Sequence, residues 1–316
     1  MAIPIVLDCD PGHDDAIALL LAAGHDAIDL RAITTVAGNC SLERATENAR
    51  RVAALAGVLD VPIAAGAAGP LEGELVVAAD IHGDSGLDGY EGRSGQAPLD
   101  PRSAVELMIA TLETASEPVT LVPTGPLTNV ARLLRDRPDL RARIGRIVLM
   151  GGSTERGNKT PAAEFNIWVD PEAAATVFGS GVPVTMLGLN LTHQARATTD
   201  VVERIRALPG EPARAVEGWL EFFGGTYARV FGEFAPPVHD PCTVALLIDP
   251  TLVRCADAFV AVETDGRWTR GATVVDFDGR LGHASNARVA LELDVRRFWD
   301  LIVGALRRVG ERARSS

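Results

Sequence analysis

Residues 8–15 read DCDPGHDD and carry four carboxylates in one short segment. Carboxylates this close repel one another in a compact loop unless a cation neutralises them, so the segment predicts a bound metal. Oxygen ligands favour calcium and magnesium over zinc, and calcium fits better if backbone carbonyls also bind. A structural interpretation competes with this one: Asp14 and Asp15 would favour the positive end of a helix dipole and Asp8 would cap a turn. Four acids around a Pro-Gly turn favour the metal site.

The elements around this segment have to bring it to the edge of a sheet. Short apolar runs alternate with longer segments of helical periodicity, which predicts βαβ units and an open, mainly parallel sheet flanked by helices. Residues 4–7 form the first expected strand, and ligands of such sheets bind beyond the carboxyl ends of the strands. Later strands are expected at 30–36, 61–64, 119–123, 146–150, 182–187, 258–263 and 273–276. Helices are expected at 13–23, 41–56, 103–115, 127–135, 171–178, 200–207, 211–230, 240–247 and 295–308.

Length and composition predict a single large α/β domain of Rossmann-like type over residues 1–316. The chain is 47% hydrophobic and 23% charged, and it has no low-complexity tract, so it can bury a substantial core. Residues 66–101 are rich in Gly and Asp and weak in periodicity, which predicts a long loop or insertion within the domain. The four cysteines form no CxxC pair, and we expect buried free thiols.

The charge balance limits the partners of the chain. A formal net charge of -12 argues against nucleic acid and anionic membranes, because both need a cationic face. The longest apolar runs are too short to cross a bilayer, and the first residues lack a basic leader. We therefore expect a cytoplasmic protein that binds a neutral or cationic small molecule.

Residues 8–16, DCDPGHDDA, resemble the DxDPGxDDA signature of the inosine-uridine-preferring nucleoside hydrolases. Other landmarks of that family match in order: GN at 38–39, HG at 82–83, PTGPLTN at 123–129, MGG at 150–152, EFN at 164–166 and HDP at 239–241. The resemblance implies a nucleoside hydrolase fold and calcium-dependent hydrolysis of the N-glycosidic bond of ribonucleosides. It also implies a homodimer or homotetramer.

The resemblance further implies a set of ligands for one calcium ion per subunit. Asp10, Asp15 and Asp240 would supply carboxylate oxygens, and Thr124 would supply its main-chain carbonyl. Each of these residues falls at an expected strand end or helix start, so segments distant in sequence can meet at one rim of the sheet. Taken alone, Asp240 is better explained as a helix cap before Pro241, and the rest of the pattern favours the metal.

For the substrate, the resemblance implies a dense set of polar contacts to ribose. Asp14 and Asn39 would bind the 2′ and 3′ hydroxyls with Asn166 beside them, whereas Asn158 and Glu164 would face the 5′ hydroxyl. A site built from such donors and acceptors rejects a deoxy analogue, because its own polar groups are then left unpaired. Isolated Asn residues are also common turn formers. The remaining expected ligand contacts are His82, Met150 and Phe165.

N-glycosidic cleavage passes through an oxocarbenium-like transition state, which requires a water nucleophile and a proton for the departing base. Calcium would orient and acidify the water, and Asp10 would accept its proton. His239 is the best candidate to protonate the base, and His82 is the second. The other histidines are interpreted as structural.

The base preference depends on the residue after His82. Purine-preferring members are expected to sandwich the base between tryptophans, but Gly83 stands at this position. The pair of His82 and His239 resembles pyrimidine-favouring or nonspecific members instead, so uridine, cytidine and inosine are the expected substrates. No role is assigned to Tyr227, Arg229 and Phe231.

Two other functions compete with this interpretation. Haloacid-dehalogenase-like magnesium phosphatases also place Asp-x-Asp after the first strand, but the Thr of their DxDxT loop is absent here. The second alternative is a non-catalytic nucleoside- or calcium-binding protein, although no expected catalytic residue is missing. Release of free base from uridine, rather than phosphate from a phosphomonoester, separates the three.

Overall fold

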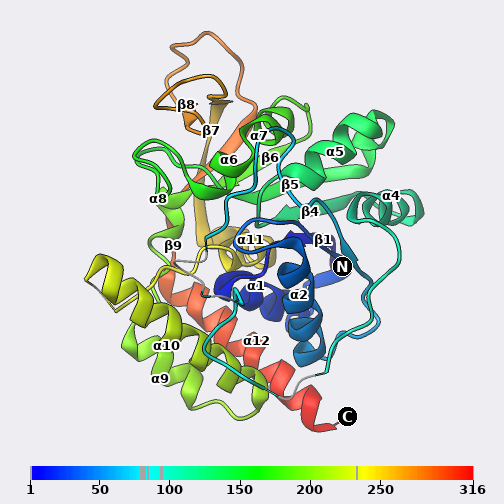
Figure 1. Cartoon of the computed structure of the whole chain (residues 1–316), viewed down its shortest axis with the longest axis vertical. Helices are drawn as coiled ribbons and strands as arrows, with labels where there is room; N and C mark the ends of the chain where they lie inside the picture. The colour runs from blue at the N-terminus through cyan, green and yellow to red at the C-terminus, as the bar shows by residue number, and fades with distance from the viewer. Residues whose placement is uncertain (1, 79–82, 84, 93–94, 233, 316) are drawn as a thin grey trace.

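A computed structural model of the chain describes residues 2–78, 83, 85–92, 95–232 and 234–315 (Figure 1). These residues form one α/β domain around a nine-stranded sheet with the order β3-β2-β1-β4-β5-β6-β9-β7-β8. The strands are β1 (Ile3–Cys9), β2 (Ile28–Thr35), β3 (Ile63–Ala65), β4 (Val119–Pro123), β5 (Ile144–Met150), β6 (Val184–Leu187), β7 (Val253–Val262), β8 (Thr273–Asp276) and β9 (Ala287–Leu293).

The helices connect and cover these strands. They are α1 (His13–Ala23), α2 (Leu42–Ala56), α4 (Ala104–Thr114), α5 (Thr128–Asp136), α6 (Phe165–Val169), α7 (Pro171–Phe178), α8 (Leu189–Thr192), α9 (Thr199–Arg206), α10 (Glu211–Phe231), α11 (Pro241–Ile248) and α12 (Val295–Ser315). Two short 3-10 helices span Pro138–Arg143 and Pro250–Leu252.

Strands β3 to β6, through β2, β1, β4 and β5, are all parallel, and β9 continues this arrangement beside β6. Strand β7 is antiparallel to both β9 and β8. The order of the strands reverses between β1 and β4, and the crevice at such a switch point is where open α/β sheets bind ligands. The expected mainly parallel sheet is therefore confirmed, and β1 lies third in the order, beside the switch point.

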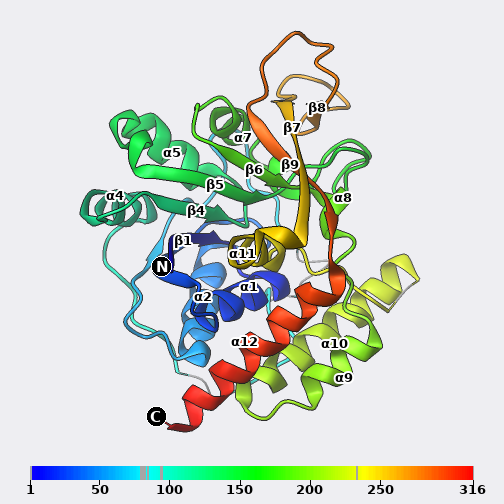
Figure 2. The ribbon, with the colours of Figure 1, turned by 180° about the vertical axis from the view of Figure 1, so that it is seen from behind.

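Two hydrophobic clusters pack against the two faces of the sheet. Alternate side chains of a strand point to opposite faces, so Ile5 and Leu7 lie in one cluster and Val6 in the other. The first cluster contains residues of α1, α2, α11 and α12, and the second contains residues of α4, α5 and α7. Figures 1 and 2 show the sheet between these two helical layers.

Several element predictions were wrong. Residues 167–169 were not among the expected helices, but they lie in α6, because the Glu164 side chain accepts hydrogen bonds from the backbone of Asn166 and Ile167 and caps a helix there. Strand β9 was missed, and β7 begins at Val253 rather than at residue 258. Both strands are half exposed, so their alternating pattern is weaker than that of the buried parallel strands.

Three other predictions concern the loop, the thiols and membranes. Between β3 and α4, the described residues of 66–101 carry neither helix nor strand, and the interpretation of the segment as an insertion stays a prediction. All four cysteines are free, and three of them are buried, as expected. Within the described ranges, every helix is too short or too polar to cross a bilayer.

Candidate active site

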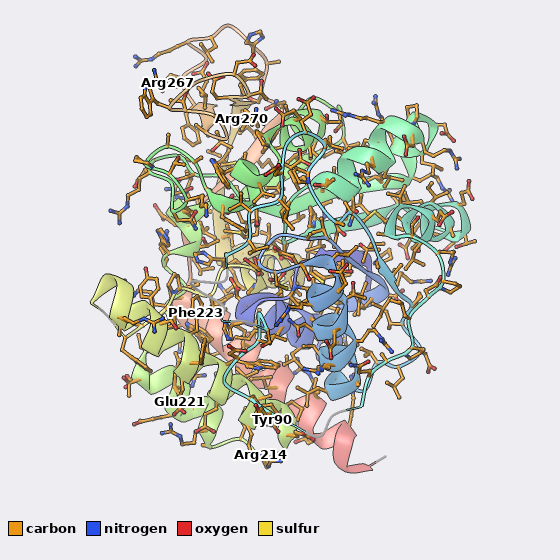
Figure 3. The ribbon with its side chains drawn as sticks, viewed as in Figure 1. Tyr90, Arg214, Glu221, Phe223, Arg267 and Arg270 are labelled. Atoms are coloured by element: carbon orange, nitrogen blue, oxygen red, sulfur yellow. The ribbon has the colours of Figure 1, made fainter. Side chains whose placement is uncertain are left out.

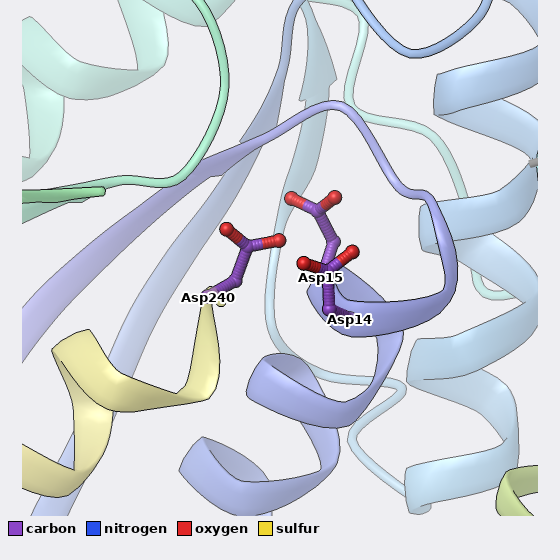
Figure 4. A group of neighbouring side chains, drawn as sticks. All are labelled: Asp14, Asp15 and Asp240. Carbon is purple, nitrogen blue, oxygen red and sulfur yellow. The ribbon is translucent and has the colours of Figure 1, made fainter. Parts of the chain in front are cut away.

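Three carboxylates meet where β1, α1 and α11 converge. Asp14 and Asp15 lie in the first turn of α1, and Asp240 immediately precedes α11 (Figure 4). All three are buried, and one carboxylate oxygen of each lies within 4.8 Å of the others. Short loops after β1 and before α11 therefore bring acids more than 200 residues apart in sequence into one cluster.

Asp10 lies in the loop between β1 and α1, beside this three-acid cluster. Its Oδ2 accepts a hydrogen bond from the Asn39 backbone at 2.6 Å, while its buried Oδ1 has no hydrogen-bond partner among the described residues. A Cβ atom at Gly38 would lie 2.1 Å from Oδ2, and one at Gly125 would lie 2.5 Å from Oδ1. Two glycines thus allow the backbone to close around this carboxylate.

Asp15 is held by donors from three segments. Its Oδ1 accepts from the Thr124 hydroxyl at 2.7 Å, and its Oδ2 accepts from the Gly12 backbone at 3.1 Å and from Asn39 Nδ2 at 3.2 Å. Thr124 follows β4, so its hydroxyl connects the loop after β4 to the start of α1. The Thr124 carbonyl, expected on the metal, accepts from Asn166 Nδ2 at 2.8 Å.

Burial and mutual repulsion raise the free energy of the ionised carboxylates in this cluster. Burial is the main cause that raises the pKa of Asp15 to about 7, and the charge of Asp14 adds to it. Burial likewise raises the pKa of Asp10 and of Asp240 well above the usual range, and the neighbouring carboxylates reinforce both shifts. These carboxylate oxygens are buried and resist ionisation, and one of them accepts no hydrogen bond from the described residues. Such a set of oxygen ligands fits a hard divalent cation.

Of the residues expected to contact ribose, Asp14 and Asn39 lie at the acid cluster, whereas Asn158, Glu164 and Asn166 form a second group around α6. Asn166 Nδ2 donates to the Thr124 carbonyl and, at 3.3 Å, to the Met150 carbonyl, so it joins the ends of β4 and β5. Glu164 is buried and accepts from the backbone of Gly152, at 2.9 Å, and of Asn166, at 2.9 Å. Burial raises the pKa of Glu164 to about 6.

Asn158 and Phe165 lie at the outer side of this group. The exposed Asn158 accepts from the Phe165 backbone at 2.9 Å, which is the turn-forming behaviour expected of an isolated Asn. The Lys159 ammonium lies 5.6 Å from the centre of the Phe165 ring and 5.1 Å from that of Trp168. Phe165, the first residue of α6, thus has its ring beside this cation.

His239 immediately precedes Asp240 and contacts the acid cluster through Asp14. Its backbone N–H donates to Asp14 Oδ2 at 3.2 Å, and its Nδ1 lies 2.7 Å from the Thr192 hydroxyl. The ring lies 5.6 Å from that of His193. Burial lowers the pKa of His239 to about 4, Asp14 opposes this shift, and His193 adds to it.

Sequence reasoning missed two supporting residues. Thr192 ends the short helix α8 and fixes the His239 ring, but a lone Thr gives no signal in the sequence. Asn129 was visible only as part of a matched motif. Its amide donates to Asp8 Oδ1 at 2.8 Å and to the Thr35 carbonyl at 2.9 Å, and Thr34 adds a second donor to Asp8. Asp8, which had no firm role, thus ties β1 to β2 and α5 beneath the acid loop.

The base-binding side is less complete. His82 lies outside the described residues, so its expected role stays a prediction. Trp219 and Trp299 are buried in the core and Trp268 is 77% exposed. Trp168, however, lies in α6, where Lys159 contacts both its ring and that of Phe165, so the expectation of a site without tryptophan stacking stays a prediction.

Comparison with known proteins decides the family. A model of the inosine-uridine preferring nucleoside hydrolases matches residues 5–300 of the chain. The chain belongs to this family. Members of the family hydrolyse nucleosides, so the chain is an N-glycosidase acting on ribonucleosides, and the phosphatase alternative is wrong.

Relatives match over nearly the whole chain. The pyrimidine-specific ribonucleoside hydrolase RihA of Shewanella sp. (strain MR-7) is 48% identical, over 97% of this chain and 96% of its own length. RihA of Escherichia coli O139:H28 (strain E24377A / ETEC) is 46% identical, over 97% and 99%. Among solved structures, a purine-preferring ribonucleoside hydrolase from Gardnerella vaginalis is 32% identical and superposes with a TM-score of 0.90, over 98% and 99% of the two chains.

Proposed function

We propose that this chain is a calcium-dependent ribonucleoside hydrolase that prefers pyrimidine nucleosides or accepts several bases. The observation that carries the metal part is the buried cluster of Asp14, Asp15 and Asp240, together with the unpaired Oδ1 of Asp10. The pyrimidine part is supported by relatives at 46–48% identity that are named pyrimidine-specific, whereas a purine-preferring structure is 32% identical.

The proposed calcium ligands are carboxylate oxygens of Asp10, Asp15 and Asp240 and the carbonyl of Thr124. The all-oxygen donor set supports calcium over zinc. When bound, the cation would polarise a water molecule for attack on C1′ of ribose. Asp10 is the proposed proton acceptor, because its Oδ1 is buried beside the cluster and accepts no hydrogen bond from the described residues.

Ribose is proposed to bind through Asp14, Asn39 and Asn166, with Asn158 and Glu164 toward its 5′ end. The Asp14 carboxylate accepts a hydrogen bond from the backbone next to Asp240, and the Asn39 amide donates to another carboxylate of the acid cluster. The Asn166 amide joins the ends of β4 and β5. The fixed positions of these donors and acceptors support selection of ribose over deoxyribose.

His239 is the proposed acid for the leaving base, with His82 as the second candidate. Its position beside Asp240 and its contact with Thr192 support the role, because the Thr192 hydroxyl holds the ring in one orientation. With a pKa near 4, the His239 ring is mostly neutral at pH 7. Its protonated form is a small fraction of the protein but a stronger acid than an ordinary imidazolium.

A homodimer or homotetramer and a cytoplasmic location complete the proposal. Both come from the resemblance and the composition, and both stay predictions.

The proposed activity is tested by measuring ribose release from uridine, cytidine, inosine, guanosine and deoxyuridine. We expect uridine and cytidine to be cleaved fastest and deoxyuridine much more slowly. A chelator should abolish release, and added calcium should restore it. Asp10→Ala should lower uridine hydrolysis by roughly two to four orders of magnitude, because it removes the proton acceptor and a metal ligand.

Asp60→Asn is the matched control, because Asp60 is an exposed acid remote from the site, and its activity should equal that of the wild type. If the wild type binds uridine but releases no more ribose than Asp10→Ala, the chain is a binding protein. Full activity in the chelator would refute the metal requirement.

A further inference from the structure

Residues 85–88, called here turn 85–88, begin three residues after His82 and pack against the loop that carries the acids. Gly86 has a φ of +82°, and a Cβ atom built on it would lie 3.2 Å from Asn48 Nδ2 and 3.4 Å from the Pro11 carbonyl oxygen. Glycine adopts this conformation without strain and leaves room for both groups. A glycine at residue 86 thus lets the turn lie directly against the acid loop.

Asn48 joins turn 85–88 to the acid loop. It lies in α2 and is only 2% exposed. Its Nδ2 donates to the Ser85 carbonyl at 2.8 Å and to the Pro11 carbonyl at 3.1 Å. A side-chain amide nitrogen has two N–H groups, so this one side chain can satisfy both carbonyls. Asn48 therefore fixes the separation of two segments that are far apart in the sequence.

His13 makes a second connection to the turn. It is the first residue of α1, it is buried, and its Nε2 lies 2.8 Å from the Asp88 carbonyl oxygen. A carbonyl oxygen can only accept a hydrogen bond, so Nε2 carries the proton in this contact. The ring also stacks on Phe223 of α10, with centroids 5.5 Å apart and planes 13° apart, which limits its rotation. Asn48 and His13 thus hold the two ends of the turn.

Helix α10 contacts the residues that follow the turn. The Tyr90 hydroxyl donates to Glu211 at 3.1 Å, and a Cβ atom at Gly89 would lie 2.5 Å from the Gly218 carbonyl oxygen. Tyr90 and Phe223, both labelled in Figure 3, mark where α10 faces this part of the molecule. Three helices, α1, α2 and α10, therefore contact a stretch that forms no helix or strand itself.

The acid loop has supports that do not depend on this turn. The Asp15 carboxylate keeps its three donors, described above, when Asn48 is changed. Loss of an Asn48 or His13 contact is therefore expected to move the turn and not the acids. A group displaced by about 1 Å in an active site can lower the rate about 100-fold, so the turn must be held closely if the neighbouring chain serves the substrate.

We propose that Asn48 and His13 are positioning residues that set the base-binding side of the site by holding turn 85–88 against the acid loop. The inference rests on the proposed function, because it takes His82 to serve the base. Both residues act through backbone carbonyls of the turn, and neither is assigned a contact with the substrate.

Asn48→Leu tests this role, because leucine has a similar size but makes neither hydrogen bond. We expect kcat/KM for uridine to fall at least about tenfold, mainly through KM, because contacts to the base are misplaced. For p-nitrophenyl riboside, which has no pyrimidine and a leaving group that departs unaided, we expect a fall of less than about threefold. His13→Phe keeps a stacked ring without the donor. It should show the same pattern, and it tests the proposal if Asn48→Leu does not fold.

Asn286→Leu is the matched control. The Asn286 amide also donates to two backbone carbonyls, that of Phe178 at 3.2 Å and that of Val260 at 2.9 Å, and it has no assigned role in the site. Loss of either asparagine leaves two carbonyls unpaired, so both variants should lower Tm. Asn286→Leu should keep wild-type kinetics on both substrates. Asn48→Leu should keep the rise in Tm on adding calcium, because the acids stay in place.

Hydrogen exchange measures the order of the turn without turnover. The backbone N–H groups of Ser85 and Leu87 are hydrogen-bonded within the turn. They should exchange at least about tenfold faster in Asn48→Leu than in the wild type, whereas residues 10–16 should exchange as before.

Four outcomes would each overturn the proposal. They are equal losses on the two substrates, loss of the calcium response, unchanged exchange at the turn, and a control variant with the kinetics of Asn48→Leu. A wild type that releases no ribose from uridine would refute the proposed function and the kinetic part of this inference together. The exchange measurement would then still decide whether Asn48 holds the turn, so the two failures are distinguishable.

Discussion

At the scale of single residues, His239 stands out from the other described histidines because two constraints fix it. Its backbone N–H is bound to Asp14 and its Nδ1 lies at hydrogen-bonding distance from Thr192. By contrast, His13 is buried against Phe222 and Phe223 on α10 and His283 stacks on Phe259, as structural residues do. His13 adjoins Asp14 in sequence, but its ring is held by these phenylalanines and by the Asp88 carbonyl, so His239 is the proposed candidate for chemistry.

His239→Ala should reveal whether this ring protonates the departing base. Hydrolysis of uridine and inosine should fall roughly 10²- to 10⁴-fold, because these bases leave poorly without a proton. Hydrolysis of p-nitrophenyl riboside should change little, since its leaving group departs unaided. His25→Ala, at the turn between α1 and β2, is the control for loss of a histidine elsewhere. Equal losses on all three substrates would assign His239 a structural role.

Sequence patterns identified many residues of this site but not what holds them. Asp10, Asp15 and Asn166 follow strand ends or start helices, so a parallel sheet brings them to one rim, and Thr124 contacts the last two. Thr192 and the partners of Asp8 could not be predicted, because a hydroxyl or amide acts there through a neighbour from a distant segment. The roles of the site residues stay predictions.

At the scale of elements, the loop from Gly151 to Glu164 is held from both ends. Glu164 accepts from the Gly152 backbone and caps α6, while Thr273 of β8 makes two hydrogen bonds with Ser153. The sequence could not foresee this arrangement, because the β-branched residues after Asn166 favour a strand and the deciding cap is a tertiary effect. An element outside the parallel sheet thus supports the proposed ribose-binding loop.

Thr273→Val should loosen this loop without disturbing the acid cluster. The substitution keeps the shape of the side chain but removes both hydrogen bonds to Ser153, each worth about 1 kcal/mol. We expect KM for uridine to rise about three- to tenfold with a small change in kcat. Thr273→Ser, which keeps the hydroxyl, should restore KM. A drop in kcat at constant KM would show that Thr273 acts on the chemical step instead.

At the scale of the whole molecule, the sheet was the most predictable feature. Buried parallel strands appear as continuous apolar runs, and the segments at 119–123 and 146–150 coincide with β4 and most of β5. The antiparallel end of the sheet was only partly predicted, since β7 and β9 are half exposed and lack such runs. Pattern alone therefore located the parallel strands better than the antiparallel end of the sheet.

Calcium should stabilise the whole fold. A ligand that binds only the folded state adds about 2.7 kcal/mol of stability at a hundred times its Kd, which shifts Tm by several degrees. We expect Tm to rise on adding calcium to chelator-treated protein and to rise less with magnesium at the same concentration. Asp240→Asn should lose most of the calcium response, whereas Asp60→Asn should keep it. An unchanged Tm in wild type would exclude a calcium site that is coupled to folding.

The position of the acids at the starts of α1 and α11 links the packing of the core to the binding of a cation. These two helices pack against each other within one core cluster, so their first turns cannot move apart to relieve the repulsion between Asp14, Asp15 and Asp240. The fold therefore holds a local frustration that a cation removes, and the site is pre-organised at the expense of the stability of the metal-free chain. Core packing and cation affinity are thereby coupled: a substitution that loosens the α1–α11 contact relaxes the acids and lowers the affinity for the metal from a distance.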